Sequence, residues 1–223
     1  MKKALITIVA VMLTAALLVL TGCDLLGEVK ITTDSREECN ELAQAFIDET
    51  VKKTNVKMVE KIGDETVMTY ERDGDTVKKD DFDGMYAFLK EGKKYVLYTE
   101  DEDLKGYWES ESGYDDAMDG LKVTLEMFLT FDEGFDEYTF SGEQIDKIEN
   151  DVTESTLKIT FSGKTEEDVT VTQTAELKAT NGLISELKVT YTEGDETDVW
   201  TIEFTYDTVS IELPDLTQFD CLD

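Results

Sequence analysis

The sequence predicts an α+β protein in which one large, curved antiparallel sheet covers an N-terminal and a central helix. Three observations predict this class. Apolar residues recur at helical spacing in residues 36–53 and 114–131. Apolar and polar residues alternate in the remaining segments, as in strands with one buried and one solvated face. The chain contains a single proline, and its C-terminal half divides into strands of about ten residues, which favours one large sheet over several small ones.

The first helix has a start signal in the sequence Ser35-Arg36-Glu37-Glu38. Ser35 at the N-cap followed three residues later by Glu38 fits a capping box, in which each side chain bonds the backbone of the other residue. One apolar stripe follows, formed by Cys39, Leu42, Ala43, Phe46, Ile47 and Val51. We therefore expect an amphipathic helix over residues 36–53.

A block of strands is expected next. Residues 55–62 and 66–72 alternate on either side of the turn sequence Gly63-Asp64-Glu65, and Asp73-Gly74 is a strong hairpin signal. Residues 84–90 and 94–99 form a second pair around Glu91-Gly92-Lys93, and residues 107–109 form a short further strand.

The central helix and a second block of strands complete the pattern. Met118, Leu121, Leu125, Phe128 and Leu129 share one helical face. From Asp136 onward the alternation is that of strands, clearest at Trp200, Ile202, Phe204 and Tyr206. We expect a last strand at Val209, Ile211 and Leu213, just before Pro214.

The N-terminus has the form of a secretory signal peptide. Lys2 and Lys3 precede 17 uncharged residues, from Ala4 to Leu20 (20 − 3 = 17). The following Leu20-Thr21-Gly22-Cys23 resembles the lipobox of bacterial lipoproteins, which implies cleavage between Gly22 and Cys23 and lipid on Cys23. A retained membrane-spanning helix is the alternative, but the apolar run is shorter than the roughly 20 residues that crossing needs.

These features predict three regions. Residues 1–22 are the signal peptide, residues 23–33 carry the lipidated cysteine and a short tether, and residues 34–223 form one domain. The protein is then expected at the cell membrane, anchored by its lipid on the extracytoplasmic face.

Composition excludes several functions. The chain has 52 Asp and Glu, 21 Lys and Arg, and no His, giving a net charge of −31. Such a charge repels nucleic acid, and a chain without His lacks an imidazole base and an imidazole metal ligand. The acidic clusters do not follow the spacing of a calcium-binding EF-hand loop. We therefore expect a non-enzyme with no cofactor and no metal site, whose charge is mainly the solvated surface of the sheet.

The cysteines leave two possibilities. With Cys23 lipidated, Cys39 and Cys221 remain, and an even number outside the cytoplasm suggests a disulfide between them. The alternative is two free thiols, with Cys39 buried in the first helix.

The order of elements and the ending from Trp200 to Pro214, together with the lipobox, resemble the LolA/LppX-like group of envelope lipoproteins. The resemblance implies an open half-barrel around helices, with an apolar cavity that takes acyl chains. The large apolar side chains that we expect to line such a cavity are Met68, Met85, Phe88, Trp108, Met118, Phe128 and Trp200.

The resulting hypothesis is a monomeric, membrane-anchored protein that binds a lipid or another hydrophobic ligand between sheet and helices. The alternative is a non-enzymatic scaffold module of the envelope. Such a module would bind a protein partner through its acidic face or a sheet edge.

Overall fold

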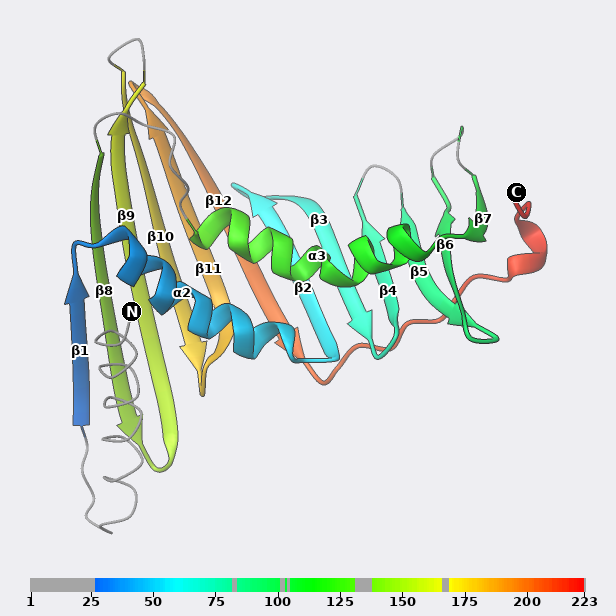
Figure 1. The fold of residues 1–223 in the computed structure, drawn as a ribbon, viewed down its shortest axis with the longest axis horizontal. Coiled ribbons are helices and arrows are strands. Elements are labelled where there is room, and N and C mark those ends of the chain that lie inside the picture. The colour runs from blue at the N-terminus through cyan, green and yellow to red at the C-terminus, as the bar shows by residue number, and fades with distance from the viewer. Residues whose placement is uncertain are drawn as a thin grey trace.

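Twelve antiparallel strands form one open, curved sheet with two α-helices across its concave face, as the sequence predicted (Figure 1). The computed structural model describes residues 27–81, 84–100, 103, 105–130, 138–165 and 169–222. The helices are α2 (Arg36–Val51) and α3 (Glu111–Leu129), with a short 3₁₀ helix η1 (Leu216–Gln218) near the C-terminus. The strands are β1 (Gly27–Thr33), β2 (Asn55–Ile62), β3 (Glu65–Asp73), β4 (Thr76–Asp80), β5 (Met85–Lys90), β6 (Lys93–Tyr98), β7 (Gly106–Glu109), β8 (Tyr138–Glu149), β9 (Val152–Lys164), β10 (Thr170–Thr180), β11 (Leu183–Glu193) and β12 (Glu196–Tyr206).

Two meanders build the sheet, in the order β1-β8-β9-β10-β11-β12-β2-β3-β4-β5-β6-β7. The meanders are β8 to β12 and β2 to β7, in which consecutive strands are antiparallel neighbours that need only short turns, and β1 adds to β8 at the edge. They join where β12 pairs with β2, in a register that runs from Trp200 opposite Ile62 to Tyr206 opposite Val56. Through this pairing and that of β1 with β8, the segments before and after the central helix form a continuous surface.

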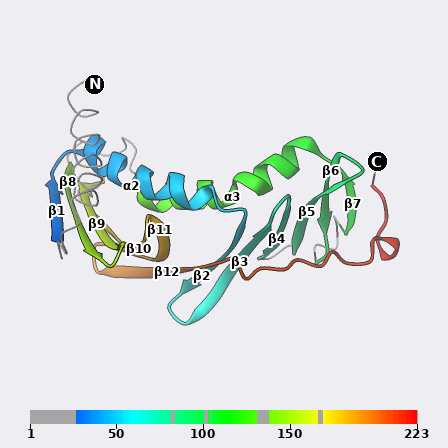
Figure 2. The ribbon, with the colours of Figure 1, turned by 90° about the horizontal axis from the view of Figure 1, so that it is seen from below.

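Both helices lie on one face of the sheet, and the strands curve toward them (Figure 2). Helix α2 contacts β8, β9 and β11, whereas α3 contacts β5 and β6, and the two helices also contact each other. The core lies between the helices and the concave face. Under α2 it is closely packed, since Cys39, Ala43, Phe46 and Ile47 are all buried there.

The cap of α2 forms only half of the predicted capping box. Ser35 Oγ accepts a hydrogen bond from the Glu38 backbone N–H at 3.4 Å. The Glu38 carboxylate does not return to Ser35; it accepts a bond from Thr33 Oγ1 at 2.5 Å. Thr33 Oγ1 in turn accepts the Ser35 backbone N–H at 3.1 Å, so β1 is fastened to the start of the helix.

The predicted tether is corrected in part. Residues 27–33 form the edge strand β1, which pairs with β8 from Gly27 opposite Ile148 to Thr33 opposite Gly142. Val29 and Ile31 alternate with the exposed Glu28 and Lys30, which is the pattern of a half-buried strand. Gly22 and Cys23, the predicted cleavage and lipidation residues, lie outside the described residues. No helix among the described residues is long and apolar enough to cross a membrane.

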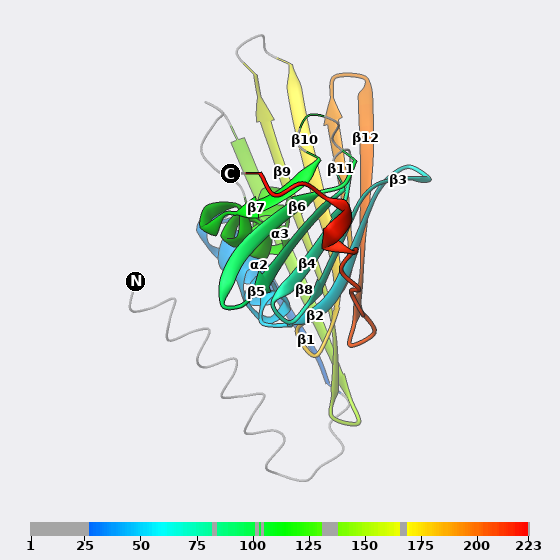
Figure 3. The same ribbon diagram turned by 90° about the vertical axis from the view of Figure 1, so that its right-hand side faces the viewer.

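The predicted last strand is instead an extended strap, residues 207–222, on the face of the sheet opposite the helices (Figures 2 and 3). Its start is held by the Asn55 side chain, whose Oδ1 accepts the Val209 N–H at 2.9 Å and whose Nδ2 donates to the Val209 carbonyl at 2.8 Å. Its end runs parallel to β7, with a bridge between Tyr107 and Cys221. Val209 and Ile211 are half-buried in this strap, whereas Leu213 is 38% exposed, so the alternation of these residues does not mark a strand of the sheet.

The predicted disulfide is wrong, because Cys39 and Cys221 are both free. Cys39 is buried in α2 near Gly142 of β8, while Cys221 pairs with β7 at the other end of the sheet (Figure 1). Strands are spaced about 4.8 Å apart, and a disulfide needs Cα atoms within about 7 Å. The width of the sheet therefore separates the two thiols.

Candidate ligand pocket

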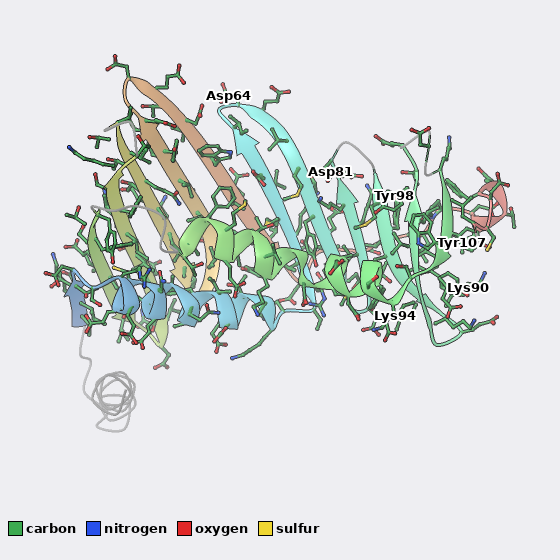
Figure 4. All side chains as sticks on the ribbon, turned by 45° about the horizontal axis from the view of Figure 1, so that its top comes forward. Asp64, Asp81, Lys90, Lys94, Tyr98 and Tyr107 are labelled. Atoms are coloured by element: carbon green, nitrogen blue, oxygen red, sulfur yellow. The ribbon has the colours of Figure 1, made fainter. Side chains whose placement is uncertain are left out.

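A pocket of about 350 Å³ lies between α3 and the concave face of strands β3 to β6. The sheet side contributes Met68, Tyr70, Lys79, Asp81, Met85 and Tyr98. The helix side contributes Gly113, Asp116, Ala117, Gly120, Val123 and Thr124. Asp81 and Tyr98 lie along one side of α3, whereas Lys94 lies on the other side (Figure 4).

Small residues bring α3 close to the sheet beside this pocket. Gly113, Ala117 and Gly120 lie three or four residues apart and so share one helical face. A Cβ added at Gly120 would lie 3.3 Å from the Tyr70 ring, and one added at Gly113 would lie 3.0 Å from Val96. The helix therefore lies almost directly on the strands at this stripe. The pocket lies beside the stripe, where larger side chains such as Met68 and Met85 line the space between helix and sheet.

Two tyrosines fasten α3 to the strands. Tyr114 Oη donates to the carbonyl of Asp75 in the β3–β4 turn at 3.0 Å. Tyr70 Oη donates to the carbonyl of Met118 at 3.5 Å, which is long for a hydrogen bond. At the N-terminus of the helix, Ser110 Oγ accepts the Gly113 N–H at 3.1 Å. The helix wall of the pocket is thus fixed at its start and near its middle.

The charged groups of the pocket are unequal in number. Its lining holds one cation, Lys79, and two carboxylates, Asp81 and Asp116. Lys79 forms an ion pair with Asp81. Glu60 is half-buried on β2 opposite the lining residue Met68, and its burial raises the pKa of its carboxyl while the charge of Lys79 opposes that rise. The positive charge of Lys79 is therefore already shared between carboxylates of the protein.

An aromatic pair closes the β6 end of the pocket. Tyr98 stacks on Trp108 of β7, with ring centroids 5.4 Å apart and planes 17° apart. Trp108 lies opposite Val96 in the register and is therefore on the concave face. It supports Tyr98 from behind, while Tyr98 is the ring that lines the pocket.

Of the seven predicted cavity residues, Met68 and Met85 line this pocket. Met118 packs against the core, and Phe128 and Trp200 lie together under the other end of α3 with ring centroids 6.1 Å apart. Phe88 is corrected, because side chains alternate along β5 and the neighbouring Ala87 belongs to the core beneath the helices. Phe88 therefore points to the opposite face, where it stacks on Tyr95 at 5.7 Å.

The sequence interpretation missed the helix wall and the polar residues of the pocket. The signal for the wall was present as Gly113, Ala117 and Gly120, a small-residue stripe at helical spacing. No comparable signal marks Lys79, Asp81 or Tyr98, since Lys79 and Asp81 lie at the end of β4 and Tyr98 at the end of β6, and the sheet register decides where these strands lie. The lining contains no Ser, Cys or His, and no group of three or more metal-ligating side chains is found in the described part of the chain.

Neither a search against protein-family models nor a search of curated protein sequences returns a match to this chain.

Proposed function

We propose that this chain is a membrane-anchored envelope lipoprotein that binds a small hydrophobic ligand, without catalysis, in the pocket under α3. The observation that supports it most is the pocket itself, between the concave face and a helix, where a half-barrel would hold its ligand. We also propose that the open sheet is a LolA/LppX-like half-barrel, which is consistent with twelve antiparallel strands around two helices.

The lining suits a ligand with an apolar body. Met68 and Met85 supply flexible thioether side chains that adapt to irregular shapes, and Ala117 and Val123 add apolar surface. The volume of about 350 Å³ is at the lower end of the range for small-molecule sites, roughly 300–1,000 Å³. The ligand is therefore a compact molecule or a single short chain rather than a complete two-chain lipid.

The sequence supports the membrane anchor, and the fold limits the distance between Cys23 and the first strand of the sheet. Strand β1 begins four residues after Cys23 (27 − 23 = 4). Four extended residues span at most about 14 Å. A lipid on Cys23 would thus hold the edge of the sheet close to the bilayer surface.

Two measurements test the proposal. Mass spectrometry of the purified protein is expected to find a co-purifying apolar compound that is reduced in Val123→Phe, which fills the mouth of the pocket. Val123 is 60% exposed, so the larger side chain should not disturb the core. Metabolic labelling with a fatty acid is expected to mark the wild type but not Cys23→Ser. A wild-type protein that neither carries nor takes up any apolar compound overturns the ligand-binding proposal.

A further inference from the structure

We infer that the pocket under α3 takes an amphiphile with a cationic head group, such as a primary aliphatic amine, and that Asp116 is the counter-ion of that head group. This inference rests on the proposed function and names its ligand class. It follows from the charges of the pocket lining, where the one cation, Lys79, is ion-paired and the Asp116 carboxylate forms no ion pair with any residue that the structure describes.

The single cation of the lining is not available to an anionic head group. Lys79 is ion-paired with Asp81, and it also interacts with the charge of the half-buried Glu60. A fatty acid carboxylate would have to displace one of these groups and would meet the other at short range. Like charges brought together in a partly buried site are unfavourable.

Asp116 is placed differently. It lies on the pocket side of α3, and within the described part of the chain it forms no ion pair. The nearby cation Lys94 is bound instead by the two neighbouring acids, Asp115 at 2.6 Å and Glu111 at 3.6 Å. The carboxylate of Asp116, which is an exposed residue, therefore remains open to a ligand at the rim of the pocket.

Two further features act against an anion. The first free N–H groups of a helix attract anions, but at α3 Ser110 Oγ already accepts the Gly113 N–H at 3.1 Å, and Glu111 occupies the first turn. The net charge of −31 also produces a field that favours the approach of cations over anions. The ion pairs at the pocket and the overall negative charge of the chain thus both favour a cationic head group.

The test uses the full chain in phosphatidylcholine vesicles and three eight-carbon probes, octylamine, octanol and octanoate, whose binding is measured by equilibrium dialysis. In Val123→Phe the mouth of the pocket is filled, so the probe that this variant retains measures partition into the vesicles and is subtracted as background. Met127→Phe is its matched control, because Met127 is on the same stripe of α3, is 62% exposed and does not line the pocket. For the charge, Asp116→Asn is compared with Asp119→Asn, an exposed acid of α3 outside the lining.

Above the background, we expect octylamine to bind about threefold or more tightly than octanol, as an exposed ion pair allows, and octanoate to bind most weakly. Asp116→Asn should abolish the preference for the amine and leave octanol unchanged, whereas Asp119→Asn and Met127→Phe should behave like the wild type. If octanol binds but octylamine binds no better, or if octanoate binds best, the inference fails and the proposed function survives. If no probe exceeds the background, both fail.

Discussion

The backbone N–H of Tyr107 donates to the carbonyl of Asp220 at 3.0 Å, and the Tyr107 carbonyl accepts the N–H of Leu222 at 2.9 Å. Through these bonds the C-terminal strap covers the outer edge of β7, one of the two edge strands of the sheet. An uncovered edge presents free N–H and C=O groups on which another chain can form a strand. The strap therefore fastens the fold and protects one end of the sheet.

Removal of residues 219–223 is expected to lower the free energy of unfolding by about 2 kcal/mol, because two backbone hydrogen bonds contribute about 1 kcal/mol each. It should also promote self-association through β7. Urea denaturation and sedimentation velocity measure the two effects. A truncated chain with unchanged stability that stays monomeric would show that the strap has neither role.

The single substitution Gly106→Ala tests the same contact between β7 and the strap without removing any residue. A Cβ at this position would lie 2.8 Å from both the Asp220 carbonyl oxygen and the Leu222 side chain. The substitution should therefore destabilise the full chain and have little further effect on the truncated chain. Equal costs in both chains would mean that Gly106 acts through β7 alone.

The two free cysteines should differ in reactivity. Burial, assisted by the charges of Glu38 and Asp34, raises the pKa of the Cys39 thiol to about 11, so that thiol remains protonated and shielded at pH 8. Cys221 is exposed. In a Cys23→Ser chain, a thiol reagent should label one cysteine rapidly in the native state and both after unfolding without reductant. Cys221→Ser should remove the rapid phase, and a fast reaction of Cys39 would contradict the burial.

Local features of the fold were predictable, because each depends on a few neighbouring residues. The apolar stripes predicted both helices, with α2 ending two residues earlier and α3 beginning three residues earlier than expected. The early start of α3 lies in Glu111, Ser112 and Gly113, which carry no apolar stripe but follow the N-cap Ser110. Asn181-Gly182 lies at a tight turn with positive φ at both residues, as its sequence indicates.

Long-range features were not predictable, because alternation alone does not identify the neighbouring strand or the buried face. Nothing in residues 55–62 shows that they pair with residues 200–206. The large aromatic Phe88 was assigned to the cavity, but strand parity places it on the other face. Met68 and Met85 line the pocket, whereas Lys79 and Asp81 become pocket residues only through the register of β3, β4 and β5.

Glu60 should make stability depend on pH in the opposite sense to Glu176. Burial raises the pKa of Glu60, so the folded state holds its proton more tightly, and the resulting stability is lost as pH rises through that raised pKa. The hydrogen bond from Lys158 lowers the pKa of Glu176, so its contribution is present at neutral pH and lost as pH falls. Relative to the wild type, Glu60→Gln should therefore become more stable between pH 4 and pH 7, and Glu176→Gln less stable. Urea denaturation at both values checks the signs, and parallel behaviour of the two variants would contradict the assignment.

The two tyrosines that hold α3 should contribute unequally. Tyr114→Phe removes a 3.0 Å hydrogen bond to the Asp75 carbonyl and is expected to lower the free energy of unfolding by about 1 kcal/mol. Tyr70→Phe removes a 3.5 Å contact to the Met118 carbonyl, so its cost should be clearly smaller. Both variants keep the aromatic ring, and packing is therefore matched in the comparison. If Tyr70→Phe costs as much as Tyr114→Phe by urea denaturation, the bond to Met118 is a principal fastening of the helix wall, and loosening it should also weaken binding in the adjacent pocket.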